Sequence, residues 1–282
     1  MRSPKNALPP ARGGLTTADH GWLARFGFSF EEGGAHLARS MMLADLRALL
    51  DQIDDLKATR SEYVNAIVSD NCLGKRSGMA RSLAARHLAN LYGLDPSVTL
   101  FRILRYFWSR DPQGQPLLAL ICAYCRDPFL RASAPFFLAL SEGSSVQRVD
   151  VENYIETVFP SRFSQATIKS AAQNVSTTWT DSGHVRGRVK KTRARAVATP
   201  GSVAYAVLVG YLTGPRGPAL FGTEYAALLD RPGALTTELA QEASRQGWIN
   251  MKRVGPVVEV TFANLLTAQE MEWTREQGNP TT

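Results

Sequence analysis

The segment between Arg186 and Arg195 carries the side chains best suited to act on another molecule. It gathers six cations with no carboxylate among them: Arg186, Arg188, Lys190, Lys191, Arg193 and Arg195. Residues 161–200 hold eight basic side chains against one acidic one, which accounts for the whole net charge of +7. A basic excess confined to one segment is typical of a surface that binds a polyanion, and DNA is the first candidate.

The spacing of these cations favours a pair of strands over a helix. A helix would scatter the charges around its axis and would include Gly187, which costs roughly 1 kcal/mol. With a turn at residues 190–191, two like-charged pairs face each other across the hairpin, Arg188 with Arg193 and Arg186 with Arg195. Such opposition destabilises a hairpin, and a phosphate backbone would relieve it.

Other interpretations of the basic segment stay open. Lys-Lys is a poor two-residue turn, so the register can differ from this one, or the tip can be longer and mobile. The segment can also be a solvated loop without a polyanion, or a contact for anionic lipid. Next to it, His184 is the one histidine placed for a phosphate contact, with plain surface as the alternative.

Two predicted helices come before the basic segment. Residues 149–159 and 164–180 show helical periodicity, with Ser164 as N-cap of the second helix and PSRFS as the turn. Helix, short turn and helix is the outline of a helix-turn-helix. The turn and the polar face of the second helix supply side chains that contact phosphates and base edges, namely Arg162, Thr167, Lys169, Gln173 and Asn174. A plain solvent face is the alternative.

The rest of the chain predicts a mainly α fold. An N-terminal helical domain is followed by helix-turn-helix or winged-helix-like elements with short β-hairpins. The expected boundaries are a disordered tail at 1–20, a helical domain at 21–145, a helix-turn-helix with basic hairpin at 148–200, a winged-helix-like segment at 201–270 and a frayed tail at 271–282.

Two further stretches repeat parts of this pattern. A helix capped by Ser77 and ending near Gly93 carries a smaller basic group, Lys75, Arg76 and Arg81. Near the C-terminus, two strands flank a tip at residues 254–256 and follow another helix. Only Lys252 and Arg253 lie near that tip, so we predict a structural or protein-contact element first and a DNA reader second.

No catalytic or metal-binding constellation emerges from the sequence. The four histidines are isolated, and the motifs HExxH and GxSxG are absent. Cys122 and Cys125 form a lone CxxC inside an apolar helix, which favours core packing over a metal or redox role. We therefore expect no enzyme, no cofactor, no metal and no small-molecule substrate.

The expected compartment is the cytoplasm. Three cysteines are an odd number, and the first residues lack the apolar core of a signal peptide. The uncharged stretch 196–215 is interrupted by Pro and Gly, and its continuous apolar part is shorter than the roughly 20 residues that a membrane span needs. We predict no membrane association.

Three stretches together, NCLGKRSGMARSLAARHL (71–88), ALICAYCRDPFLRASA (119–134) and SRFSQATIKSAAQNVSTTWTDSGHVRGR (161–188), resemble the BrxA family of bacteriophage exclusion (BREX) defence systems. The resemblance spans roughly residues 35–265. It implies a cytoplasmic, non-enzymatic, largely helical protein with helix-turn-helix-like parts that binds DNA beside other BREX components. The matching residues are Lys75, Arg76, Arg81, Thr167, Lys169, Asn174, Arg186 and Arg188.

The expected function is therefore largely sequence-nonspecific binding of double-stranded DNA by an accessory protein of a phage-defence system. If all six cations of the basic segment contact phosphates, the log–log slope of affinity against salt is roughly −5. Two rivals remain: a protein–protein adaptor whose basic patch docks an acidic partner, and a winged-helix transcriptional regulator that prefers one operator sequence.

Overall fold

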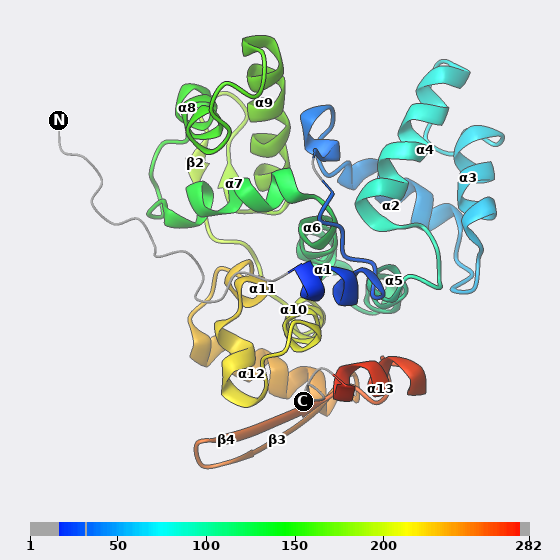
Figure 1. Ribbon diagram of the computed structural model, residues 1–282, viewed down its shortest axis with the longest axis vertical. Helices are drawn as coiled ribbons and strands as arrows, with labels where there is room; N and C mark the ends of the chain where they lie inside the picture. The colour runs from blue at the N-terminus through cyan, green and yellow to red at the C-terminus, as the bar shows by residue number, and fades with distance from the viewer. Residues whose placement is uncertain (1–16, 32, 277–282) are drawn as a thin grey trace.

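The computed structural model describes residues 17–31 and 33–276 and is mainly helical (Figure 1). Its α-helices are α1 (Thr17–Ala24), α2 (Leu43–Gln52), α3 (Arg60–Val68), α4 (Gly78–Tyr92), α5 (Thr99–Arg110), α6 (Gln115–Arg126), α7 (Pro128–Ala139), α8 (Arg148–Val158), α9 (Gln165–Asp181), α10 (Pro200–Leu212), α11 (Glu224–Ala227), α12 (Gly233–Arg245) and α13 (Ala268–Glu276). Three 3-10 helices are η1 (Ala35–Leu37), η2 (Pro112–Gly114) and η3 (Gly217–Gly222). Two antiparallel hairpins complete the described part, β1 (Val185–Arg186) with β2 (Thr192–Arg193) and β3 (Asn250–Val254) with β4 (Val257–Thr261).

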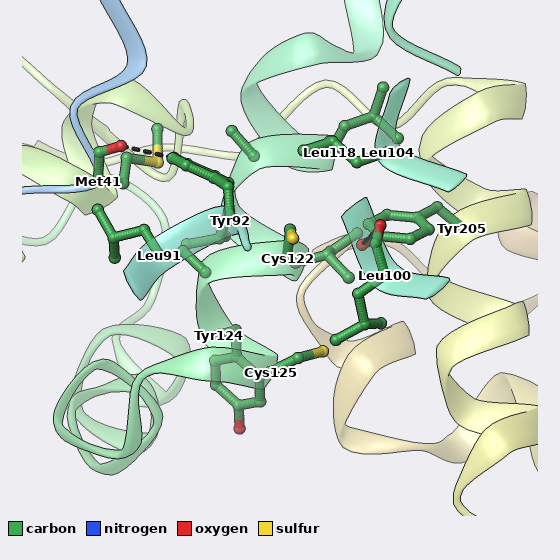
Figure 2. Packing of buried hydrophobic residues seen from close by; sticks show 14 of the residues in the cluster. Met41, Leu91, Tyr92, Leu100, Leu104, Leu118, Cys122, Tyr124, Cys125 and Tyr205 are labelled. Carbon is green, nitrogen blue, oxygen red and sulfur yellow. Dashed lines mark hydrogen bonds between the residues drawn. The ribbon is translucent and has the colours of Figure 1, made fainter. Parts of the chain in front are cut away.

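Helix α6 lies at the centre of the core, between α4, α5, α7 and α10 (Figure 1). Cys122 and Cys125 are fully buried on it, close to Leu100 and Tyr205 (Figure 2). Burial raises the pKa of Cys122 to about 11, so its thiol stays neutral at pH 7. The prediction that this CxxC packs in the core is confirmed.

Helix ends follow local sequence signals. The Ser77 side chain accepts a hydrogen bond from the Ala80 backbone at 3.2 Å, and α4 ends at Gly93. In the same way, Ser164 accepts from the Thr167 backbone at 3.2 Å at the start of α9. Side-chain oxygens at these positions satisfy backbone donors that have no partner inside the helix. Both predicted N-caps are confirmed.

The first hairpin is part of a small sheet beside α9. Strand β1 pairs with β2, and Ser145 forms an isolated antiparallel bridge to Thr192 on the other side of β2. The backbone of Arg193 donates to the Ser144 carbonyl at 2.8 Å, and that of Val146 donates to the Lys191 carbonyl at 2.9 Å. Three extended segments thus lie side by side, ordered β1, β2 and residues 144–146.

The register of this hairpin corrects the sequence-based pairing. Val185 pairs with Arg193 and Arg186 with Thr192, so residues 187–191 form the tip. The two-residue turn at 190–191 was wrong, and the opposed arginine pairs do not form. The chain turns earlier because Gly187 takes a φ of 100°, a conformation that side chains rarely allow. The longer tip, left open by the sequence, is the one found.

Hydrogen bonds from the N-terminal part hold α9 in place. The ring of His36 is fully buried, with Nδ1 2.8 Å from Asp127 Oδ2 and Nε2 2.9 Å from Thr178 Oγ1. Asn174 Nδ2 donates to the His36 carbonyl at 3.1 Å, and the Met41 backbone donates to Thr178 Oγ1 at 2.8 Å. The segment around His36 therefore joins α9 directly to the preceding helices.

The chain ends differ in part from the predicted tails. Residues 17–20 belong to α1 rather than to a disordered tail, while residues 1–16 lie outside the described residues. Residues 271–276 are the end of α13 rather than a frayed tail, and 277–282 also lie outside the described residues. Glu270 anchors α13 because it is buried and receives hydrogen bonds from Arg102 on α5.

No helix in residues 17–31 and 33–276 has the length and apolar character needed to cross a membrane. The uncharged stretch near residue 200 forms α10, which is packed against α5, α6 and α12. Its apolar side chains from Val203 to Val209 are buried inside the protein. The apolar character of this stretch therefore reflects core packing.

Candidate nucleic-acid interface

The exposed face of α9 is polar and carries one cation. Ile168, Ala172, Val175 and Trp179 are buried on the opposite face, where they hold the helix on the protein. Polar side chains of the first three turns face solvent: Gln165, Lys169, Ser170 and Gln173. Amide, hydroxyl and ammonium groups of this kind contact phosphates and base edges.

Two predicted members of this face serve structural roles. Asn174 is half-buried and donates to the His36 carbonyl, so its amide group helps to fix the N-terminal segment. Thr167 Oγ1 lies 3.0 Å from Ser164 Oγ and contributes to the N-terminal cap. Because these two side chains bond inside the protein, Lys169 and Gln173 are the predicted residues of this face that remain available for a ligand.

The hairpin tip, residues 187–191, and the adjoining Arg186 of β1 present the most accessible cations of the basic segment. Arg186, Arg188 and Lys190 are exposed, and no carboxylate of residues 17–31 or 33–276 forms an ion pair with them. Val189 stands between two of these cations and is 97% exposed. Cations without an internal counterion can pair with the phosphates of a polyanion.

Lys191 fixes the tip beside α9. Its side chain is half-buried, and Nζ donates to the Ser176 carbonyl at 3.2 Å and to Thr180 Oγ1 at 3.1 Å. Burial lowers the pKa of Lys191, an effect that the nearby Asp181 carboxylate opposes. Ser176 and Lys169 are separated by about 10 Å along the helix axis. Lys191 thus acts as a positioning group that sets the tip next to the exposed face of α9.

Arg193 is buried and does not belong to the accessible surface. Its guanidinium forms two 2.8 Å hydrogen bonds with the carboxylate of Asp230, and it donates to the carbonyls of Phe137 at 2.9 Å and His184 at 3.1 Å. A guanidinium with these partners cannot reach a phosphate without unfolding its surroundings. The expectation that Arg193 contacts DNA is therefore corrected.

Arg195 takes an intermediate position. Its Nε lies 2.8 Å from Glu142 Oε2, but both side chains are about half exposed. An exposed ion pair contributes only about 0–1 kcal/mol. Arg195 can therefore exchange this carboxylate for a phosphate at small cost.

His184 is buried rather than exposed. One ring nitrogen, Nδ1, lies 2.9 Å from Ser182 Oγ, and Nε2 lies 3.0 Å from the Leu228 carbonyl. Burial lowers the pKa of His184 to about 4, so the ring is neutral at pH 7. Both sequence-based alternatives, a phosphate contact and plain surface, are wrong for this residue.

Arg162 lies in the turn between α8 and α9. Its guanidinium sits over the rings of Phe159 and Phe163, 5.9 Å and 5.6 Å from their centroids. The side chain is exposed at the start of α9. It thus extends the basic surface beyond Lys169.

The smaller basic group near α4 is mostly engaged inside the protein. Lys75 Nζ pairs with Asp45 Oδ1 at 2.7 Å, and Arg81 Nη1 donates to the Val68 carbonyl at 2.8 Å. Arg76 is exposed and makes no ion pair with the described residues. Of the three predicted contacts, Arg76 is the one available without breaking an internal bond.

A groove of about 370 Å³ links this group to the end of α9. Lys75 and Asp181 both line it, together with Arg39, which the sequence did not single out. Asp181 also interacts electrostatically with Lys191 of the basic segment. The group near α4 and the basic segment therefore approach each other at Asp181. A long-range contact of this type leaves no signal in local sequence.

No protein-family model, no curated protein and no solved structure matches the chain. In the described part, no three His, Cys, Asp or Glu side chains lie close enough to hold a metal ion. The candidate site is the polar face of α9 with the adjoining hairpin tip and the exposed arginines that flank them, Arg162 before α9, Arg186 on β1 and Arg195 after β2. We call this the α9 surface, and its members are Arg162, Gln165, Lys169, Ser170, Gln173, Arg186, Arg188, Lys190 and Arg195.

Proposed function

We propose that this chain binds double-stranded DNA through the α9 surface, as a non-enzymatic accessory protein of a BREX phage-defence system. The observation that carries the DNA proposal is the set of exposed cations at Arg186 and on the tip, which have no carboxylate partner among the described residues and adjoin a polar helix face. Duplex DNA carries one negative charge per about 1.7 Å of its axis. A surface of this kind gains affinity by releasing counterions from phosphates.

The order of elements supports a winged helix-turn-helix in this region. Helix α7, the extended residues 144–146, helices α8 and α9, and the β1–β2 hairpin follow one another, with β2 in the middle of the small sheet. In a helix-turn-helix, the second helix lies in the major groove with its N-terminal residues toward the bases. Here that helix is α9, with Gln165, Lys169 and Gln173 as base or phosphate contacts.

The BREX role rests on the resemblance of residues 71–88, 119–134 and 161–188 to the BrxA family. In such a role the protein binds DNA of many sequences, because it acts beside other defence components. The exposed cations of the α9 surface support this, since contacts to phosphates carry no sequence information directly. With Lys169, Arg186, Arg188 and Lys190 on phosphates, the expected salt slope is about −3.6 rather than −5.

The test is a comparison of two triple variants with equal loss of charge. R186A/R188A/K190A, the tip variant, removes Arg186 and the two exposed cations of the tip, while K57A/R60A/R245A removes exposed cations from other helices and connections. We expect the first variant to lose most of its affinity for a fluorescent duplex and to make the salt slope about 2.7 less steep. The control variant should retain the wild-type slope.

Three outcomes decide the proposal. Equal effects of both variants, or none, refute the α9 surface as the DNA site. A preference of 10³ or more for one sequence favours a transcriptional regulator over an accessory protein. Binding to an acidic protein that excess duplex does not displace favours the adaptor.

A further inference from the structure

The β3–β4 hairpin forms an arm that projects from the body near α12 and α13 (Figure 1). Its root is anchored, because Ile249, Val260 and Phe262 are buried. Its tip is not covered by the described residues: Val254 is 79% exposed and Val257 is 66% exposed. The register pairs these two valines with each other across the turn.

Cations adjoin this apolar tip. Lys252 and Arg253 are exposed, and Arg253 Nε donates to the Gly255 carbonyl at 3.3 Å, which keeps the guanidinium at the turn. The same combination occurs on the first hairpin, where Val189 stands between Arg188 and Lys190. Two separate hairpins thus present exposed valines together with exposed cations.

We infer that the β3–β4 arm is a second contact for duplex DNA, an inference that rests on the proposed function. Lys252 and Arg253 pair with phosphates, and the tip from Val254 to Val257 lies against the minor groove. Proteins that bind this groove combine cations with apolar side chains that pack on sugars and base steps. The two hairpins then bind one duplex at two places.

The acidic side chains near the arm limit this contact to its tip. Glu238 is exposed on α12, the helix that precedes the arm, and repels phosphates there, whereas Glu242 on the same helix is paired with Arg245. Glu259 lies directly across from Lys252 in the register, on the same face of the arm. Glu259 therefore weakens the affinity of Lys252 for phosphate. Neutralising Glu259 should then strengthen DNA binding, which provides a gain-of-binding test.

The experiment uses the full chain and a fluorescent duplex at several salt concentrations. We expect K252A/R253A to make the salt slope about 1.8 less steep. E259Q should tighten binding about twofold to fivefold, the range that one exposed ion pair provides. V254S/V257S should weaken binding with an unchanged slope, because apolar contacts release no counterions. The control D51N, which removes one exposed carboxylate from α2, should leave affinity unchanged.

Comparison with R186A/R188A/K190A separates this inference from the proposed function. If that variant loses binding while K252A/R253A and E259Q behave as wild type, the arm does not contact DNA and the α9 surface stands. If K252A/R253A weakens binding while the tip variant does not, the arm stands and the α9 surface fails. An arm that docks a protein instead leaves duplex binding unchanged in all arm variants, which overturns the inference. Circular dichroism checks that each variant is folded.

Discussion

Replacing Asp230 by Ala is expected to destabilise the protein strongly. The substitution removes the carboxylate that accepts two 2.8 Å hydrogen bonds from Arg193. The Arg193 side chain is only 4% exposed, so it cannot turn toward water. The carbonyls of Phe137 and His184 remain as acceptors but do not neutralise the charge. Removing one partner of a buried ion pair costs about 3–5 kcal/mol in the free energy of unfolding.

This loss is large compared with the whole stability of a domain, about 5–15 kcal/mol. The matched control is Glu142→Ala, which removes the partner of Arg195. Because that pair is exposed, its loss costs about 0–1 kcal/mol. The difference in stability between D230A and E142A therefore measures how much more the buried ion pair of Arg193 contributes than the exposed ion pair of Arg195.

Urea unfolding monitored by circular dichroism at pH 7 gives both values. Adding Arg193→Met to D230A should recover part of the stability, since no buried charge is then left unpaired. Duplex binding by the folded fraction of D230A should keep the wild-type salt slope. If the free energy of unfolding of D230A lies within about 1 kcal/mol of the wild-type value, the structural role of Arg193 is refuted. The same holds if R193M stays stable but makes the salt slope of duplex binding less steep by about 0.9, the value of one phosphate contact.

Two further predictions concern His184 and Gly187. The pKa of folded His184, about 4, lies below that of an unfolded histidine, so the unfolded state binds the proton first on acidification. The contribution of neutral His184 to the free energy of unfolding is complete above pH 6.5 and falls by about 3 kcal/mol toward pH 4. In H184N, the urea midpoint should therefore change less between pH 7 and pH 5 than it does in wild type. At Gly187, a Cβ would lie 2.0 Å from the Lys190 carbonyl oxygen. G187A should reshape the tip and weaken duplex binding at a stability cost of about 1 kcal/mol, and an unchanged affinity by fluorescence anisotropy would show that tip shape is unimportant.

Local sequence signals predicted α4 and α9 well. Ser164 and Ser77 cap the helices that their positions indicate, because capping depends only on residues within one turn. The apolar stripe of α9 is buried as expected, and the second hairpin turns at the predicted residues. These features are set by neighbours in the chain, so periodicity and turn residues suffice to find them.

The fate of each cation could not be predicted in the same way. Arg193 is buried because Asp230, 37 residues later, meets it, while Arg186 has no such partner among the described residues. Asn174 is similarly held by the carbonyl of His36, 138 residues earlier. Within the basic segment all arginines look alike. Long-range partners divide them into structural and accessible groups.

The anchoring of α9 by His36 bears on how the protein can be dissected. A fragment that starts at residue 148 would strip Thr178 and Asn174 of the groups they bond in the intact chain. Helix α9 therefore depends on the segment around His36, and transferring α9 to another protein would require this segment to be transferred as well.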